Sequence, residues 1–195
     1  MRIIGITGGV GSGKSRVLSY MEQEYGAVIC QADHVAWELQ RPGETGYCRI
    51  VSCFGENILN EDGTINRGTL GQIVFADKEK LGKLNQILHP AVKVRIREQI
   101  AAEKAKGTKL FVLEAALLLE EHYDEICDEL WYIYTDKQVR TERLIRDRGY
   151  SEEKISSMMA SQAFEETYRR GCQKVIDNSR TFEETCEQIA QAIKQ

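Results

Sequence analysis

The chain has 195 residues, of which 42% are hydrophobic and 29% are charged, and its formal net charge is −4. These values are typical of one globular domain with room for a modest insertion. They argue against a membrane-spanning protein, because no apolar run approaches about 20 residues, and against general nucleic-acid binding, which requires a basic surface. The N-terminus also lacks the features of a signal peptide, so we expect a cytoplasmic protein.

Strands and helices alternate along the predicted chain. We expect strands at residues 3–7, 28–30, 109–113, 130–134 and 174–176, and helices at 16–25 and at 182–193, the latter capped by Thr181. Residues 35–107 contain no convincing strand, but apolar residues recur at helical spacing and are interrupted at Pro90. This order predicts an α/β fold with a three-layer α/β/α arrangement and a five-stranded, mostly parallel sheet. The core of this fold would comprise residues 1–34 and 108–195, with a helical insertion at 35–107.

The most specific motif lies between the first expected strand and helix, where residues 8–15 read Gly-Gly-Val-Gly-Ser-Gly-Lys-Ser. Closely spaced glycines allow backbone N–H groups to surround a polyphosphate, and the following helix directs its positive dipole end at the same anion. Lys14 would reach the β- and γ-phosphates, and the Ser15 hydroxyl would hold Mg²⁺. The predicted ATP-binding residues are Gly8, Gly9, Gly11, Ser12, Gly13, Lys14, Ser15 and Arg16.

Polar residues follow three of the predicted strands, at the edge where ligands of parallel sheets bind. Asp33 is the best candidate for a carboxylate that accepts the proton of an attacking hydroxyl, although it could instead cap the helix that follows. Glu114 is suited to the surroundings of a metal ion, but an ion pair at the strand end explains it nearly as well. Thr135 follows the fourth strand.

Arg140, Arg143 and Arg146 recur every third residue on a predicted helix. Such a row could close over a triphosphate as a lid at about residues 140–168 and stabilise the transferred group. Arg140 and Arg143 are therefore predicted catalytic residues, together with Lys14 and Asp33. The alternative is a solvated face on which these arginines pair with acidic residues four positions away.

Six cysteines are scattered along the chain without a Cys-x-x-Cys pair or any zinc-like spacing. In a cytoplasmic protein we expect all six to be reduced. The cysteines therefore predict neither a metal site nor a disulfide framework.

Residues 5–15 resemble the opening of dephospho-coenzyme A kinases, and the similarity extends along almost the whole chain. Further matching positions are Ala32-Asp33, Pro42-Gly43, Phe54-Gly55, Ile58-Leu59, residues 62–67, Leu70, Val74-Phe75, Leu84-Asn85, Leu88-His89-Pro90, Leu117-Leu118, Glu120, Gln162 and residues 175–178. The chain departs from the family pattern at Arg16, Gln31, Ala116, the segment 146–149, Met158 and Cys172-Gln173. None of these departures removes the glycine-rich loop or Asp33.

The resemblance implies an enzyme that uses MgATP to phosphorylate the ribose 3′-hydroxyl of dephospho-coenzyme A, the last step of coenzyme A synthesis. It further implies that Asp33 is the base, that the helical insertion holds the acceptor with His89 in the substrate-binding region, and that the arginine segment is the lid. We expect small-molecule substrates, no nucleic-acid or membrane partner, and a monomer or small homo-oligomer.

Two classes of alternative remain at this stage. The chain could be another small-molecule kinase, such as a nucleoside monophosphate kinase, or a nucleotide-binding protein without phosphoryl transfer. A GTPase switch is disfavoured because the sequence has neither Asn-Lys-x-Asp nor Asp-x-x-Gly. An inactive ATP-binding paralogue is disfavoured because Lys14, Ser15 and Asp33 are all present.

Overall fold

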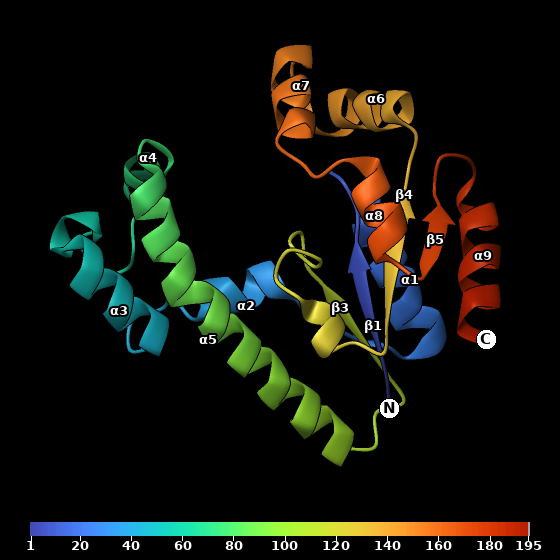
Figure 1. The fold of residues 1–195 in the computed structure, drawn as a ribbon, viewed down its shortest axis with the longest axis horizontal. Helices are drawn as coiled ribbons and strands as arrows, with labels where there is room; N and C mark the ends of the chain where they lie inside the picture. The colour runs from blue at the N-terminus through green and yellow to red at the C-terminus, as the bar shows by residue number, and fades with distance from the viewer. Residues whose placement is uncertain (195) are drawn as a thin grey trace. The chain divides into compact units, whose positions relative to one another are not determined.

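The structure of the chain is a computed structural model that describes residues 1–194 (Figure 1). The strands are β1 (Arg2–Thr7), β2 (Val28–Gln31), β3 (Leu110–Glu114), β4 (Glu129–Tyr134) and β5 (Lys174–Asp177). The α-helices are α1 (Lys14–Tyr25), α2 (Ala32–Glu38), α3 (Thr45–Phe54), α4 (Arg67–Phe75), α5 (Lys78–Ala105), α6 (Lys137–Arg148), α7 (Glu152–Ala160), α8 (Glu165–Gly171) and α9 (Phe182–Lys194). All five predicted strands are confirmed to within about two residues at each end.

The five strands form one sheet in the order β2-β3-β1-β4-β5. Strand β1 lies between β3 and β4 and is parallel to both, and β4 is parallel to β5. The chain therefore crosses from one side of β1 to the other between β3 and β4. Such a reversal of strand order opens a crevice at the carboxyl end of the central strand, and the glycine-rich loop begins there.

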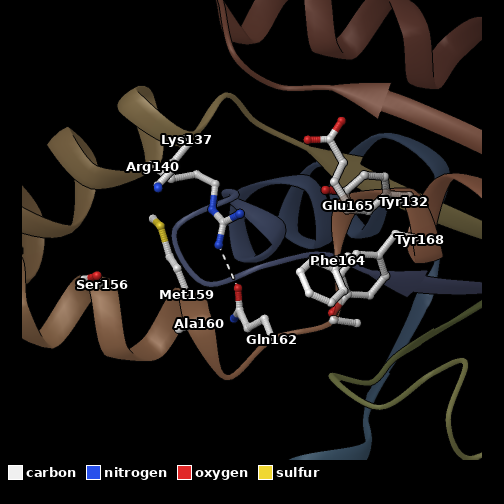
Figure 2. A pocket seen from close by; sticks show the side chains of 11 residues that line it. Tyr132, Lys137, Arg140, Ser156, Met159, Ala160, Gln162, Phe164, Glu165 and Tyr168 are labelled. Carbon is white, nitrogen blue, oxygen red and sulfur yellow. Dashed lines mark hydrogen bonds between the residues drawn. The ribbon is translucent and has the colours of Figure 1, made fainter.

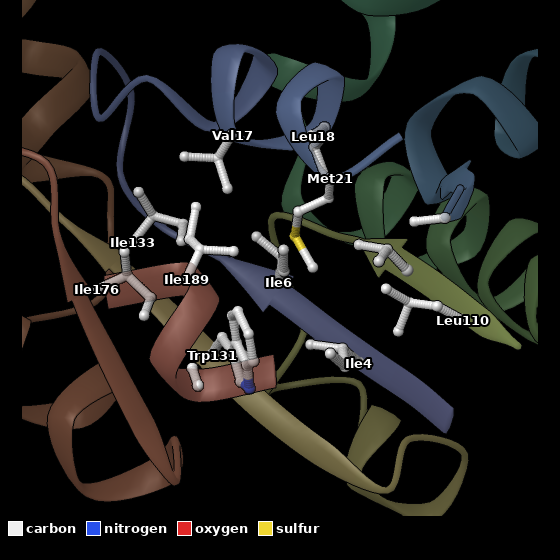
Figure 3. Packing of buried hydrophobic residues seen from close by; sticks show 13 residues of the cluster. Ile4, Ile6, Val17, Leu18, Met21, Leu110, Trp131, Ile133, Ile176 and Ile189 are labelled. Carbon is white, nitrogen blue, oxygen red and sulfur yellow. The ribbon is translucent and has the colours of Figure 1, made fainter. Parts of the chain in front are cut away.

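One face of the sheet packs against α1 and α9 through a continuous apolar cluster (Figure 3). Ile4 and Ile6 on β1 alternate with residues that face the other side, as the two-residue period of a strand requires. Trp131 on β4 is fully buried in the same cluster, and Ile189 on α9 covers it from the helix side. This cluster fixes the start of α1 relative to the sheet, and so positions the loop between β1 and α1.

The opposite face is covered by the segment that follows β3 and by α8. A Cβ atom at Gly5 would lie 2.6 Å from the Leu130 side chain and 3.2 Å from that of Leu118, so a larger residue at this point of β1 would force these side chains to move. Tyr168 on α8 stacks on Tyr132 of β4 with ring centroids 5.0 Å apart. Both faces of the sheet are thus covered, in agreement with the predicted three-layer α/β/α fold.

The described chain divides into two compact units, residues 1–29 with 103–194 and residues 30–102. The second unit, which we call the inserted unit, has its own apolar cluster. Ile50 on α3 and Ile58 in the turn after it are fully buried there, together with Leu70 and Val74 of α4. Its secondary structure is almost entirely helical, as the sequence predicted.

Helix α5 corrects one sequence-based expectation, because it continues through Pro90 for 28 residues. Proline removes the hydrogen bond to the carbonyl of residue 86. Both Gln86 and Pro90 are exposed, so water can solvate the released carbonyl and the helix need not end. Across residues 1–194, no helix combines the length and the apolar character needed to cross a membrane.

Candidate functional site

The loop between β1 and α1 has the backbone shape that the glycine pattern predicted. Gly13 precedes α1 with φ 84° and ψ 19°, the left-handed conformation that glycine adopts without strain. A side chain at this position would also collide with the amide nitrogen of Asn178. Glycine is therefore required at residue 13 for two independent reasons, and the loop backbone stays accessible to a ligand.

Residues at the ends of β4 and β5 hold the loop in place. The carbonyl oxygen of Ser12 accepts hydrogen bonds from Thr135 Oγ1 at 3.0 Å and from Asn178 Nδ2 at 2.8 Å. Asn178 is buried, and its Oδ1 accepts a hydrogen bond from Thr185 Oγ1 at 3.0 Å. The buried hydroxyl of Ser12 has no hydrogen-bond partner in the described chain. The loop is thus pinned through its carbonyl group, while one buried donor remains available.

Lys14, the first residue of α1, folds back over the loop. Its Nζ donates to the carbonyl oxygen of Gly8 at 2.6 Å and lies 3.8 Å from Glu114 Oε1 at the end of β3. The ion-pair interpretation of Glu114 is therefore borne out in this structure, and the carboxylate also lies at the edge where a metal ion would be held. The Lys14 ammonium group is positioned over the backbone that would surround a polyphosphate.

The three arginines of α6 differ in their contacts, because two of them reach the loop or Asn178 and the third does not. Arg140 Nε donates to the carbonyl oxygen of Val10 at 2.8 Å, and its guanidinium group lies directly against Gly9. Arg143 donates to the carbonyl oxygen of Asn178 at 2.9 Å. Arg146 is exposed and pairs with Asp147 at 2.7 Å. None of the predicted pairs at four-residue spacing comes within ion-pair distance among residues 1–194. Asp136 instead caps α6 by accepting from the Gln138 backbone N–H. Asp147 acts on Arg143, and Glu142 on Arg146, only through longer-range electrostatics.

The hydrogen-bond partners of Arg140 and Arg143 are neutral, and the carboxylates that act on the two side chains, Glu165 and Asp147, form no ion pair with them. Arg140 and Arg143 each donate to a neutral main-chain carbonyl oxygen, and the second partner of Arg140 is the amide oxygen of Gln162 at 2.7 Å. Burial lowers the pKa of both guanidinium groups, although arginine remains protonated in proteins. Two partly buried cations that are hydrogen-bonded only to neutral oxygens favour an anionic ligand at the loop.

A cavity of about 300 Å³ lies beside Arg140, between β4 and helices α6, α7 and α8 (Figure 2). Gln162, at the end of α7, reaches across to the guanidinium group of Arg140. Phe164 and Tyr168 line the other side. The segment 151–171 is therefore connected to the glycine-rich loop through one hydrogen-bonded pair, Arg140 and Gln162.

Ser15 and Arg16 occupy the first turn of α1 and are exposed. The Ser15 hydroxyl is thus available as an oxygen ligand, whereas the Arg16 guanidinium carbon lies 3.8 Å from the centre of the Phe182 ring. Among residues 1–194 no three His, Cys, Asp or Glu side chains are grouped as a metal cage. This donor set fits Mg²⁺, which commonly takes only one or two protein oxygens and completes its shell with water and phosphate.

Asp33 and His89 belong to the inserted unit. Asp33 is exposed in the first turn of α2, and His89 is half-buried on α5. The capping interpretation of Asp33 is wrong, because the residue before α2 is Gln31 and no side chain caps this helix. The Asp33 carboxylate has no hydrogen bond within the described chain, so the local structure leaves it available for chemistry.

The family model for dephospho-CoA kinase matches residues 2–184. This chain belongs to the dephospho-CoA kinase family. A family member from Carboxydothermus hydrogenoformans is 41% identical over 188 residues, which cover 96% of this chain and 90% of that relative. The crystal structure of a Thermus thermophilus protein is similar with a TM-score of 0.82 and 26% identity, covering 98% of this chain and 95% of that one. The structure of the dephospho-CoA kinase from Campylobacter jejuni is similar with a TM-score of 0.73 and 25% identity. The match covers 100% of this chain and 96% of that one.

Two residues near the loop, Asn178 and Gln162, are indicated by the sequence only through the family resemblance. Asn178 follows β5, so the rule that pointed to Thr135 could also have identified it. Gln162 carries no such signal, because it lies between two helices. Among the departures from the family pattern, Gln173 has a structural role, since its side chain accepts from the Leu130 backbone N–H at 2.6 Å and joins β5 to β4.

Proposed function

We propose that this protein transfers the terminal phosphoryl group of ATP to the ribose 3′-hydroxyl of dephospho-coenzyme A, giving coenzyme A and ADP. The observation that carries the proposal is a pair of guanidinium groups at a glycine-rich loop, both hydrogen-bonded to neutral oxygens, in a chain of the dephospho-CoA kinase family. A phosphoryl-transfer site needs positive charge where negative charge accumulates on the transferred group.

In this proposal the loop residues bind the triphosphate. Backbone N–H groups from Gly8 to Gly13 and the unpartnered Ser12 hydroxyl donate to phosphate oxygens, and Lys14 moves from the Gly8 carbonyl to the β- and γ-phosphates. Arg140 and Arg143 hold the equatorial oxygens of the transferred group. Arg16, although predicted to contact ATP, is assigned a supporting role because it stacks on Phe182.

Mg²⁺ bound with ATP would neutralise charge on the β- and γ-phosphates. Ser15 is the residue that would hold it, with Glu114 in its surroundings. When the Lys14 ammonium group moves to the phosphates, the Glu114 carboxylate loses the ion pair it has in this structure. Its negative charge would then be compensated by the divalent cation.

Asp33 is proposed as the base that accepts the proton of the 3′-hydroxyl. Support comes from its exposure, from the absence of a capping role and from its position directly after β2. The inserted unit would hold the acceptor, with His89 among the binding residues, and residues 140–168 would act as the lid. Arg140 donates hydrogen bonds both to the loop and to Gln162, so closing of residues 140–168 would be transmitted through Arg140 to the bound phosphates.

The decisive experiment is a coupled assay of ADP release with purified protein, MgATP and dephospho-coenzyme A. We expect turnover with a product one phosphate heavier, whose new phosphate is removed by a 3′-nucleotidase. Nucleosides and nucleoside monophosphates should be used far more slowly. Faster turnover of any of these acceptors would indicate another small-molecule kinase, and no turnover with any acceptor would indicate an inactive paralogue.

The control for this assay is Lys14→Ala. Removing a charge that stabilises the transferred group costs about 10²- to 10³-fold in kcat. Lys83→Ala, an exposed lysine on α5, should retain wild-type turnover. Turnover of Lys14→Ala near that of the wild type would refute the role assigned to the loop. We further propose that the enzyme works in the cytoplasm as a monomer or small homo-oligomer, without nucleic-acid or membrane partners.

A further inference from the structure

Gln162 lies in the short connection between α7 and α8 and lines the cavity beside Arg140 (Figure 2). Its backbone N–H donates to the carbonyl oxygen of Met159, whereas its side-chain oxygen Oε1 accepts from Arg140 Nη2 at 2.7 Å. Within residues 1–194 the Gln162 side chain has no other hydrogen-bond partner. A substitution of Gln162 therefore changes the contact with Arg140 and leaves the backbone hydrogen bond of the connection in place.

The side-chain amide of Gln162 can face Arg140 in only one orientation. Arginine carries N–H donors and no acceptor, so the atom opposite Nη2 must be the amide oxygen. A glutamate at this position would offer an oxygen of the same reach together with a negative charge. The amide thus provides a directed hydrogen bond and does not neutralise the guanidinium group.

Arg140 is held along one edge of its planar guanidinium group. Nε donates to the carbonyl oxygen of Val10 at 2.8 Å, and Nη2 donates to Gln162. In the described part of the chain, Nη1 and the second N–H of Nη2 have no hydrogen-bond partner. These two nitrogens form the end of the fork, which matches two oxygens of one phosphate group. The two bonds therefore fix Arg140 and leave one bidentate edge for an anion.

Gly9 makes room for this orientation of Arg140. A Cβ atom at Gly9 would lie 2.4 Å from Nη2 and 2.8 Å from Nη1 of the guanidinium group. Any side chain at this position would displace Arg140 from the loop. The guanidinium group therefore lies directly against the backbone that would surround a polyphosphate.

Glu165 is the one carboxylate among the residues that line this cavity in the described chain. It forms an ion pair with Arg169 at 2.6 Å and acts on Arg140 only through longer-range electrostatics. The position from which a carboxylate would neutralise Arg140 is occupied by the neutral Gln162. The arrangement thus combines a fixed guanidinium group with an undiminished positive charge.

We propose that Gln162 is a positioning residue for phosphoryl transfer, whose neutral amide holds Arg140 toward the transferred phosphoryl group without neutralising it. This inference rests on the proposed function, because it assigns a residue that acts through Arg140 in that reaction. It requires both the length and the neutrality of the Gln162 side chain.

The kinetic test compares two substitutions of Gln162. Gln162→Ala removes one of the two bonds that hold Arg140 and should lower kcat by about tenfold. Gln162→Glu keeps the size of the side chain but pairs with the guanidinium group, so kcat should fall by about 10²-fold, as in Arg140→Ala. The KM for dephospho-coenzyme A should change less than about twofold in both variants. A kcat for Gln162→Glu equal to or above that of Gln162→Ala would overturn the proposal.

Two further variants serve as controls for these measurements. Gln191→Glu introduces the same charge at an exposed position of α9 and should retain wild-type kcat. Gln162→Asn keeps the amide but is one methylene shorter, so it should lose about as much kcat as Gln162→Ala, and it replaces that variant if alanine does not fold. Wild-type kcat in Gln162→Asn would contradict the requirement for length.

A double-mutant cycle tests whether Gln162 acts through Arg140. In the Arg140→Ala background, Gln162→Ala should lower kcat less than about twofold, because no guanidinium group remains to be positioned. If the losses of the two single variants multiply in the double variant, Gln162 acts independently of Arg140 and the proposal is wrong. Thermal unfolding of all variants should give Tm values near wild type.

A binding test does not depend on the acceptor. ATP and ADP differ only in the γ-phosphate that Arg140 is proposed to contact, so calorimetric titration of both nucleotides reports on this contact. Preference for ATP over ADP should fall by about tenfold in Gln162→Glu and in Arg140→Ala, the effect of losing one charge-assisted hydrogen bond, and should persist in Gln191→Glu.

The outcomes separate this inference from the proposed function. Wild-type turnover of dephospho-coenzyme A with an unchanged ATP preference in Gln162→Glu would overturn the inference and leave the activity in place. A lost ATP preference in Gln162→Glu, in a protein that does not phosphorylate dephospho-coenzyme A, would support the positioning role and contradict the proposed activity.

Discussion

The side-chain amide of Asn178 donates a hydrogen bond to the main-chain carbonyl of Ser12 across 2.8 Å. The two residues are 166 positions apart in the sequence, and the bond connects the end of β5 to the glycine-rich loop. Thr185 on α9 fixes the amide orientation by donating to Asn178 Oδ1. The loop conformation therefore depends on the C-terminal part of the chain as well as on the local glycines.

Replacing Asn178 should reveal this dependence. Asn178→Ala leaves the Ser12 carbonyl with the Thr135 bond alone and should cost about 1–3 kcal/mol in the free energy of unfolding. Asn178→Asp should cost more, because a carboxylate oxygen would face the carbonyl oxygen in a buried position. Denaturant unfolding and the KM for ATP measure both effects. The exposed Asn57→Asp is the control, and an aspartate variant as stable as the alanine variant would contradict the argument.

The arginines of α6 provide a comparison within a single helix. Arg140→Ala and Arg143→Ala should each lower kcat by about 10²-fold or more, because each removes a cation proposed to contact the transferred group. Arg146→Ala should leave turnover and Tm close to wild type, since this exposed side chain forms a surface ion pair with Asp147 and does not reach the loop. Steady-state kinetics and thermal unfolding of the three variants provide the measurements. A similar loss of turnover in all three would mean that α6 acts through its overall charge rather than through specific contacts.

Asp33→Asn tests the proposed base directly. The substitution preserves size and removes the ability to accept a proton, so kcat should fall by about 10²- to 10⁴-fold. The Kd for ATP and the Tm should stay near wild type, because Asp33 is exposed and does not cap α2. Asp124→Asn, another exposed aspartate, is the matched control. A large fall in Tm accompanied by little change in kcat would assign Asp33 a structural role.

The six cysteines are all free thiols, and their environments predict an order of reactivity. Cys48 and Cys53 are exposed, whereas burial raises the pKa of Cys30 and Cys172 to about 12. Only the thiolate reacts, so at pH 8 a disulfide reagent should modify Cys48 and Cys53 rapidly and spare Cys30 and Cys172 until the chain unfolds. Peptide mass mapping after a short reaction identifies the modified residues. Early modification of Cys30 would show that the inserted unit opens readily.

Patterns in the sequence were sufficient for the sheet and the loop, because a buried parallel strand needs a short apolar run and the loop needs glycines at fixed spacing. These patterns were not sufficient to predict that α5 continues through Pro90. Whether a proline ends a helix depends on whether water can solvate the carbonyl group that loses its hydrogen bond. The sequence also did not show in which direction the side chains of α6 point. Equal spacing made Arg140, Arg143 and Arg146 look equivalent, yet only the first two reach loop residues or Asn178, because α6 begins at a cap on Asp136.

The two apolar clusters have no residue in common, and the backbone passes between the two units only after residue 29 and before residue 103. Each unit therefore keeps its own interior when the other changes. Recombination at these two junctions would exchange the whole helical segment and leave the residues of the sheet cluster in place, but the first junction falls within β2, so the new segment must also complete this strand. Because the proposed base Asp33 belongs to the exchanged segment, any replacement must bring its own carboxylate at this position together with its acceptor contacts.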